Sequence, residues 1–305
     1  MKWIKKGLIY CPTGDLWWAR THAYVPTAEV LDDCIRVYFA SWDVNRFGRI
    51  GFVDLDIYDP SRILYLTPKP ILDIGELGTF DDCGVTPSCV FSVGGLKHLY
   101  YIGWQQTERV PHMLFTGLAI SIDGSNFTRY CVVPILDRID GEPFSRSAPY
   151  IIVEDGIWKM WYWSCFRWSK EEGETARYYN VIRYAESYDG IDWRSDPHVC
   201  VSPEGPVEYA IGRPWVVKDG GVYKMWYSIR SKAQISYRLG YAESLDGLHW
   251  KRKDHEVGIS VSETGWDSEM ICFSSIVNAG GKRYMFYNGN RHGENGFGYA
   301  VLEEE

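Results

Sequence analysis

Apolar and polar residues follow a pattern that recurs along the chain about every sixty residues. In each copy a Pro or its equivalent opens a short apolar run, an acidic or glycine-rich turn follows, and a strongly aromatic run ends in Tyr or Phe. Two copies are nearly identical: SAPYIIVEDGIWKMWYWSC at 147–165 and GRPWVVKDGGVYKMWYSIR at 212–230. Two β-rich runs separated by a tight turn predict a β-hairpin in every copy.

Five copies account for the whole chain. They open at Pro26, Pro87, Pro149, Pro214 and Ser274, with successive spacings of 61, 62, 65 and 60 residues over a length of 305. A third β-rich run follows the hairpin in three clear cases, and an Asp-Gly pair at 123–124, 189–190 or 246–247 predicts the turn after it.

A fourth run then begins at Phe127, Trp193 or Trp250. Four antiparallel strands repeated around an axis are typical of a β-propeller. We therefore predict an all-β fold: a five-bladed propeller of four-stranded antiparallel blades, as one domain over residues 1–305.

The two ends of the chain complete the predicted architecture. The fifth copy stops at its third run, GFGYAVLEEE, whereas MKWIKKGLIYCP at the amino end resembles the fourth run of another copy. We expect the amino-terminal strand to close the last blade and so remove an open sheet edge.

The amino-acid composition argues against several classes of binding partner. The net charge of −8 argues against a nucleic-acid-binding surface. No stretch approaches the roughly 20 apolar residues of a membrane span. The eight cysteines contain no C-x-x-C pair, so we expect reduced thiols, a cytoplasmic protein, no metal site and no cofactor. Aromatic residues make up 16% of the chain, which exceeds the needs of a core and favours a ligand with flat faces.

Repeated residues are expected to build the scaffold. The aromatic pairs that end the second runs should pack between blades: Trp161, Tyr162, Trp226, Tyr227, Phe286 and Tyr287. The three S-x-D-G motifs are interpreted as turns shaped by their Asp side chains. Function is expected where the copies differ.

The copies differ most in the residues that lead into each opening Pro. Because these lead-ins should meet at one end of the propeller axis, we expect their charged side chains to converge there: Arg20, His22, Asp81, Asp82, Arg146, Glu208, Arg213, Asp267 and Glu269. Carboxylates that share a concave site separate into proton donors and acceptors, and two of them are the minimum for cleaving a glycosidic bond. For any single position, a surface charge or a structural ion pair is the alternative.

The predicted roles follow from residue type. Asp82 and Glu208 are the expected acid and base, and Glu269 or Asp267 is the third, orienting carboxylate. Arg20, His22, Arg146 and Arg213 are expected to bind an anionic part of the substrate, because guanidinium groups grip phosphate and carboxylate. Trp104, Trp266 and Tyr209 are expected to stack on sugar faces. A nucleophilic serine or cysteine mechanism lacks its G-x-S-x-G motif.

The segment from Tyr223 to Trp250 reads Y-x-M-W-Y-S and then Y-A-E-S-x-D-G-x-x-W. Through this repeated text the whole chain resembles the five-bladed propeller group of glycoside hydrolase families 43, 32, 68 and 117 and the mannoside phosphorylases of family 130. The resemblance implies an axial active site, with Asp82, Glu208, Asp267 and Glu269 as its acids. Families 43 and 32 place an essential Asp at the first innermost strand, where this chain reads RTHAYVP.

The sequence thus predicts a carbohydrate-active enzyme that cleaves or transfers a glycosidic linkage of a carbohydrate or sugar phosphate. The alternatives are a glycoside phosphorylase, since the Arg and His set is similar in residue type to a family 130 phosphate site, a glycosyltransferase of surface-polysaccharide metabolism, or a non-catalytic sugar-binding propeller.

Overall fold

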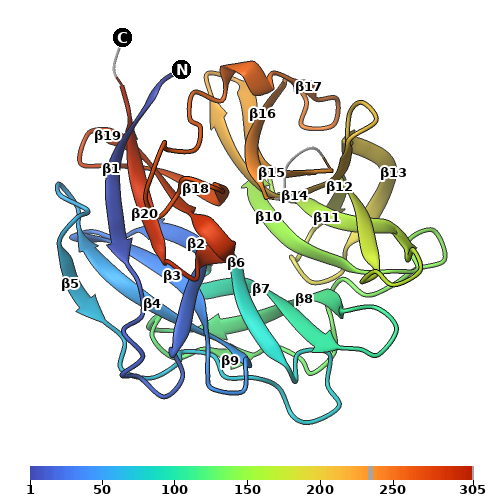
Figure 1. Ribbon diagram of the computed structural model, residues 1–305, viewed down its shortest axis with the longest axis horizontal. Coiled ribbons are helices and arrows are strands. Elements are labelled where there is room, and N and C mark those ends of the chain that lie inside the picture. Colours follow the sequence, from blue (N-terminus) through green and yellow to red (C-terminus); the bar gives the residue numbers. More distant parts are fainter. Residues whose placement is uncertain (233–235, 304–305) are drawn as a thin grey trace.

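The computed structural model describes residues 1–232 and 236–303, and nearly all of its regular structure is β-strand (Figure 1). The all-β prediction is therefore confirmed. The strands form consecutive antiparallel groups. One group holds β2 (Thr21–Val30), β3 (Cys34–Trp42), β4 (Gly48–Asp56) and β5 (Ile63–Leu66). The next holds β6 (Gly84–Val93), β7 (Leu96–Gln106), β8 (His112–Ser121) and β9 (Thr128–Arg129).

The second half of the chain repeats this order. A further group holds β10 (Arg146–Glu154), β11 (Ile157–Ser169), β12 (Arg177–Ser187) and β13 (Arg194–Val201). Another holds β14 (Glu208–Asp219), β15 (Val222–Ser231), β16 (Arg238–Ser244) and β17 (Lys251–Arg252). The last holds β18 (Cys272–Ala279), β19 (Lys282–Asn288), β20 (Phe297–Leu302) and β1 (Trp3–Tyr10).

The first strand of each group lies nearest a common centre, and the later strands lie progressively farther out (Figure 1). These inner strands, β2, β6, β10, β14 and β18, contact one another around that centre. Two helical turns complete the structure, η1 (Asp254–Glu256) and α1 (Asn290–Gly293). In the described part of the chain no helix is long and apolar enough to cross a membrane.

The two chain ends meet in one sheet, as the sequence predicts. The amino-terminal strand β1 pairs antiparallel with β20, from Trp3 opposite Leu302 to Tyr10 opposite Phe297. Figure 1 shows both termini at the same edge of the molecule. The β18–β20 group thus receives its outer strand from the other end of the chain.

The three S-x-D-G motifs form the predicted turns. In the second of them the Ser187 hydroxyl accepts a hydrogen bond from the Gly190 N–H at 3.0 Å, and Asp189 Oδ1 accepts from the N–H groups of Ile191 and Asp192 at 2.9 Å. Gly190 has φ 76°, a left-handed conformation that glycine adopts without steric cost. The same bonds recur around Asp123 and Asp246.

Several inner strands carry a β-bulge at their opening Pro or Ser. The residue before it has a positive φ in four groups: 54° at Val25, 50° at Ala148, 55° at Arg213 and 55° at Phe273. The pairing register shifts at the same places, between Ser147 and Tyr150 for example. Bulges re-aim side chains, and here they change the direction of the residues at the start of each inner strand.

The repeated aromatic residues form the core, as predicted. Trp161, Tyr162, Trp226, Tyr227, Phe286 and Tyr287 are each at most 1% exposed. The Trp161 indole N–H donates to the Gly247 carbonyl at 2.7 Å and so links β11 to the turn of the following group. The repeated aromatic residues therefore make the contacts between neighbouring strand groups.

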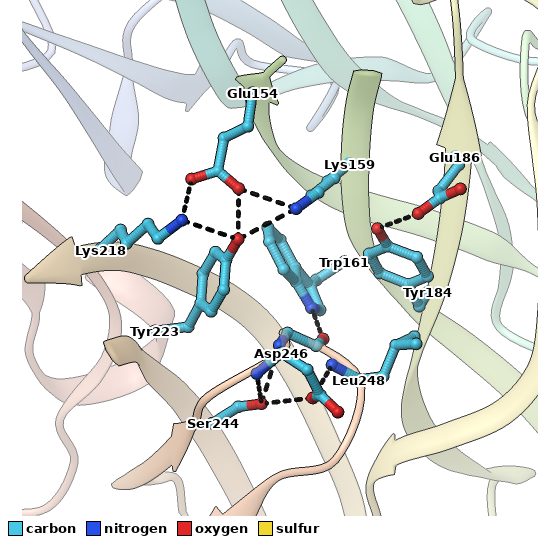
Figure 2. A network of polar contacts seen from close by, with 11 residues as sticks. Glu154, Lys159, Trp161, Tyr184, Glu186, Lys218, Tyr223, Ser244, Asp246 and Leu248 are labelled. Atoms are coloured by element: carbon cyan, nitrogen blue, oxygen red, sulfur yellow. Dashed lines mark hydrogen bonds and ion pairs between the residues drawn. The ribbon is translucent and has the colours of Figure 1, made fainter. Parts of the chain in front are cut away.

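Charged residues also join neighbouring groups. Glu154 at the end of β10 accepts hydrogen bonds from Lys159 and from Lys218 of the next group, both at 2.8 Å, and from the Tyr223 hydroxyl (Figure 2). Comparable ion pairs join Glu29 to Lys97 and Asp219 to Arg283.

Candidate functional site

Aromatic, histidine and arginine side chains from every strand group gather near the starts of the inner strands. Most of them are partly exposed. They are linked to one another by hydrogen bonds, ring contacts and electrostatic interactions. We call this set the aromatic–cation cluster: His22, Trp42, His112, Trp168, Tyr178, Tyr209, Arg230, Tyr237, Phe273 and His292.

Arg230, at the end of β15, lies at the centre of the cluster. Its Nη1 donates to the Tyr178 hydroxyl at 2.6 Å, and that hydroxyl is 2.9 Å from the Tyr237 hydroxyl. The guanidinium carbon is 4.9 Å from the ring centre of Tyr237 and 5.5 Å from those of Tyr178 and Tyr209. Three tyrosines from three different segments therefore fix one cation by ring contacts and a hydrogen bond.

Two histidines flank Arg230 from opposite groups. His112 of β8 lies 6.0 Å from Tyr178, and His292 of α1 lies 5.4 Å from Tyr237. Burial and the nearby Arg230 charge lower the pKa of His112 to about 4, and desolvation and the same charge lower the pKa of His292, although this residue is exposed. Both rings are therefore neutral at pH 7, and each keeps one N–H donor and one acceptor nitrogen.

The first group contributes His22, stacked on Trp42 with ring centres 4.0 Å apart. Its Nδ1 is buried and has no hydrogen-bond partner. Burial lowers the pKa of His22. The Trp42 indole donates to the Tyr24 hydroxyl at 3.1 Å, and Tyr24 in turn contacts Trp104. Three predicted residues, His22, Tyr209 and the adjoining Trp104, thus lie in or beside the cluster.

Four strand groups contain a node that sequence reasoning did not anticipate. In each, the hydroxyl of a second-strand tyrosine donates to a carboxylate, and a cation pairs with the same carboxylate. The nodes are Tyr101–Asp81–Arg129, Tyr162–Glu142–Arg146, Tyr227–Asp254–Arg252 and Tyr287–Asp267–Lys5. Asp81, Glu142 and Asp267 are at most 5% exposed, whereas Asp254 is partly exposed, and these hydroxyl–carboxylate–cation contacts stabilise the groups that contain them.

Two of the four predicted carboxylates belong to these nodes. Asp267 is 2% exposed, 2.6 Å from Lys5 Nζ and 2.9 Å from the Tyr287 hydroxyl. Glu208 accepts from both terminal nitrogens of Arg252, at 2.8 and 3.1 Å. Their acceptor atoms are already engaged with cations.

The other two predicted carboxylates are less constrained. Asp82 Oδ2 accepts from the Gly78 N–H at 2.9 Å, and the Cys83 thiol interacts with the same carboxylate. The buried Oδ1 has no well-formed hydrogen bond among the described residues. Glu269 is exposed, and its backbone is held by Asn290 and Arg238, one residue from Tyr237. Among the described residues no hydrogen bond or ion pair joins any two of the four carboxylates.

The predicted cations are spread over the molecule. Arg20 is exposed and donates to the Gly14 carbonyl, and Arg146 is buried against Glu142. Arg213 is 3% exposed and crosses the centre from β14 to donate to the Thr27 hydroxyl of β2 at 3.0 Å. Trp266 stacks on Tyr287 at 5.1 Å within the last group.

Arg230, Tyr178, Tyr237, His112 and His292 were missed by the sequence reasoning. One signal was present: aligned second strands place Trp42, Trp104, Cys165, Arg230 and Asn290 at equivalent positions, three after the conserved Tyr or Phe. The copies match before this position and diverge at it. Sequence differences between the copies just after the second strand therefore indicate the site, as do the differences just before the first strand.

Metal-ligating side chains are scattered within residues 1–232 and 236–303. No group of three His, Cys, Asp or Glu residues there could hold a metal ion. A cavity of about 1020 Å³ lies away from the cluster, beside the chain ends and Gly280–Arg283, and no aromatic residue lines it.

Comparisons with known proteins give one group of sequence relatives. The chain is 39% identical to the uncharacterized protein Rv1502 of Mycobacterium tuberculosis strain H37Rv over 304 residues, 99% of this chain and 100% of the relative. The uncharacterized protein MT1551 of strain CDC 1551 matches with the same identity and coverage. No family model matches the chain.

Solved structures share the fold at low sequence identity. A thermostable family-43 glycoside hydrolase has a TM-score of 0.71 at 18% identity, covering 93% of this chain and 91% of its own. A glycosyl hydrolase from Bacteroides ovatus has a TM-score of 0.73 at 14% identity, covering 99% and 90%. A structure from family 130, mannoside phosphorylases that include hydrolases of β-1,2 mannosidic linkages in Candida mannan, has 0.73 at 14%, covering 99% and 93%. The fold is therefore of the propeller glycosidase type.

Proposed function

This chain belongs to the same family as the uncharacterized protein Rv1502 of Mycobacterium tuberculosis, and we propose that it acts on a carbohydrate at the aromatic–cation cluster. The observation that carries the proposal is the convergence of Trp, Tyr, His and Arg side chains from every strand group at one end of the inner strands. Aromatic faces stack on sugar rings, while imidazole and guanidinium groups hydrogen-bond to ring substituents. The fold shared with glycoside hydrolases agrees with this choice.

We also infer that the strand groups are the five blades of one propeller over residues 1–305. The inner strands contact each other around a centre, and β1 supplies the fourth strand of the β18–β20 group. In this arrangement the cluster surrounds one end of the axis.

For turnover we propose Asp82 and Glu269 as the reacting carboxylates. Asp82 would protonate the leaving oxygen of the glycosidic bond, since its Oδ1 has no well-formed hydrogen bond among the described residues to break first. The exposed Glu269 would activate the attacking water, phosphate or sugar hydroxyl from the Tyr237 side. Glu208 and Asp267, held by Arg252 and Lys5, would act as positioning residues.

Sugar binding without turnover is the second candidate. It is favoured by the ion pairs that occupy Glu208 and Asp267, and by the Arg20 and His22 lead-in where hydrolases of families 43 and 32 carry an Asp. A phosphorylase or glycosyltransferase would use the same cluster with a different acceptor.

Aryl glycosides of the common hexoses and pentoses, incubated with and without inorganic phosphate, separate these functions. Hydrolysis releases the phenol in both conditions, whereas phosphorolysis requires phosphate and produces a sugar 1-phosphate. We expect Asp82→Asn to lower the rate by about 100-fold or more, the range for loss of a general acid. The exposed Asp140→Asn is the matched control and should retain the wild-type rate.

Two results would count against turnover at this site. Equal rates for the wild type and Asp82→Asn would remove Asp82 from the mechanism. Glycoside binding by calorimetry, without product from any substrate, would establish the non-catalytic alternative.

A further inference from the structure

Arg230 differs from most other arginines near the inner strands because no carboxylate pairs with it in the described chain. Its hydrogen-bond partners there are the hydroxyls of Tyr178 and Tyr209. A guanidinium group has five N–H donors, so several of those of Arg230 have no acceptor among the described residues. The arginines that do pair with carboxylates form a larger set: Arg36, Arg49, Arg129, Arg146, Arg252 and Arg283.

The surroundings of Arg230 are basic although the whole chain carries a charge of −8. Arg177 lies 5.3 Å from the Tyr209 ring, and Arg167 lies 3.9 Å from the Tyr179 ring in the adjoining segment. Lys232 is exposed two residues after Arg230. Arg177 is paired with Glu174 at 3.7 Å, so the charges that no carboxylate neutralises among the described residues are those of Arg230, Arg167 and Lys232, and these attract an anionic ligand.

The orientation of the Arg230 guanidinium group favours an anion with two neighbouring oxygen atoms. The bond to Tyr178 and the contact between the Tyr178 and Tyr237 hydroxyls hold the guanidinium plane in place. A fixed guanidinium presents paired N–H donors that match two oxygens of a phosphate or carboxylate. His112 and His292 lie on either side and offer further donors.

We propose that the carbohydrate bound by this protein carries an oxyanion, phosphate or carboxylate, and that Arg230 is the residue that recognises it. This inference rests on the proposed carbohydrate site and adds its substrate class. The sugar ring stacks on the tyrosine and tryptophan faces of the cluster, while the oxyanion binds the free N–H donors of Arg230. Several other arginines also lack a carboxylate partner among the described residues. Of these, Arg213 is too deeply buried to meet a ligand, and Nη1 of Arg238 is already held by the carbonyls of Tyr237 and Glu269.

Isothermal calorimetry on the full chain tests the proposal. The probes are glucose, mannose and galactose, their 6-phosphates, glucuronate, galacturonate, and inorganic phosphate alone. We expect at least one phosphate or uronate to bind at least tenfold more tightly than its neutral parent sugar. The 6-phosphates and uronates distinguish the two sources of the oxyanion.

Arg230→Gln should abolish the difference between charged and neutral sugars, and Arg230→Lys should keep part of it, since an ammonium retains the charge without the paired donors. Arg194→Gln, at an exposed position on the outer strand β13, removes the same charge away from the cluster and should keep the preference. Thermal unfolding of each variant checks that folding is intact.

The possible outcomes distinguish failure of the oxyanion proposal from failure of the proposed carbohydrate site. If a neutral sugar binds as tightly as its charged forms, or if Arg230→Gln keeps the preference, the oxyanion proposal is wrong while the carbohydrate site stands. If no sugar in the panel binds and inorganic phosphate alone does, both proposals fail. If Arg230→Gln does not fold, Arg230→Lys decides, because unchanged discrimination in that variant also overturns the role of paired donors.

Discussion

Carboxylate residues have different roles in this protein, and the residues that contact each one indicate its role. Asp267 and Glu269 are two positions apart, yet the former is buried between Lys5 and Tyr287 and the latter is exposed beside Tyr237. A carboxylate paired with a buried hydroxyl and a cation holds the fold together. An exposed one beside the aromatic–cation cluster, such as Glu269, is not committed to an ion pair among the described residues.

This contrast predicts different stabilities for two conservative variants. Asp267→Asn should lower the free energy of unfolding by about 1–3 kcal/mol, because it leaves Lys5 and the Tyr287 hydroxyl without a charged acceptor. Glu269→Gln should change it by less than about 0.5 kcal/mol, as is usual for exposed positions. Urea unfolding measures both. Equal losses would contradict the assignment of Asp267 to the scaffold.

Some turns between strands lie in close contact with aromatic side chains, and others do not. Gly190 of the second S-x-D-G turn accepts a hydrogen bond from the Tyr100 hydroxyl at 2.8 Å, and a Cβ added there would lie 2.6 Å from the Trp158 ring. Gly156, in the hairpin turn between β10 and β11, has nearly the same φ of 77° but no atom within 4 Å of such a Cβ.

Two alanine variants therefore separate backbone strain from crowding. Gly156→Ala should cost about 1–2 kcal/mol for a left-handed conformation alone. Gly190→Ala should cost about 1–3 kcal/mol more, because Trp158 and Tyr100 must also move. Thermal and denaturant unfolding give the two values. A Gly190→Ala variant no less stable than Gly156→Ala would show that the turn moves away freely.

The strands and turns could be predicted because their signals are local and repeated. S-x-D-G turns, hairpin glycines and the buried aromatic pairs recur in copy after copy, and the structure places Trp161 and Tyr227 in the core as expected. The site was less predictable, since its contacts join distant segments. Glu208 was interpreted as a free carboxylate because Arg252, its partner, lies 44 residues away.

At the scale of the whole molecule, ion pairs between neighbouring groups couple stability to pH. Burial alone would raise the pKa of Glu154, but hydrogen bonds from Lys159, Lys218 and Tyr223 outweigh it and lower that pKa to about 2 (Figure 2). The value is below the ordinary one of 4.5, so this carboxylate stabilises the fold above pH 4.5. The contribution is lost as the pH falls from about 4.5 to about 2.

Glu154→Gln should accordingly be less stable than the wild type at pH 7 and equally stable near pH 2. Urea unfolding at intervals between pH 7 and pH 2 measures the difference between the two proteins. Glu204→Gln, at an exposed position, is the control and should follow the wild-type curve. If the difference in free energy of unfolding between the wild type and Glu154→Gln stays constant with pH, the carboxylate charge is not the source of the stabilisation.

The pairing of β1 with β20 has a consequence for how the protein is made. Residues 3–10 are synthesised well before their partners at 297–302. During synthesis Trp3 and its neighbours therefore stay without their β-sheet partner until the four intervening strand groups have been made. This sheet can form only after those groups, and a nascent chain that stalls before residue 297 leaves an unpaired apolar strand exposed.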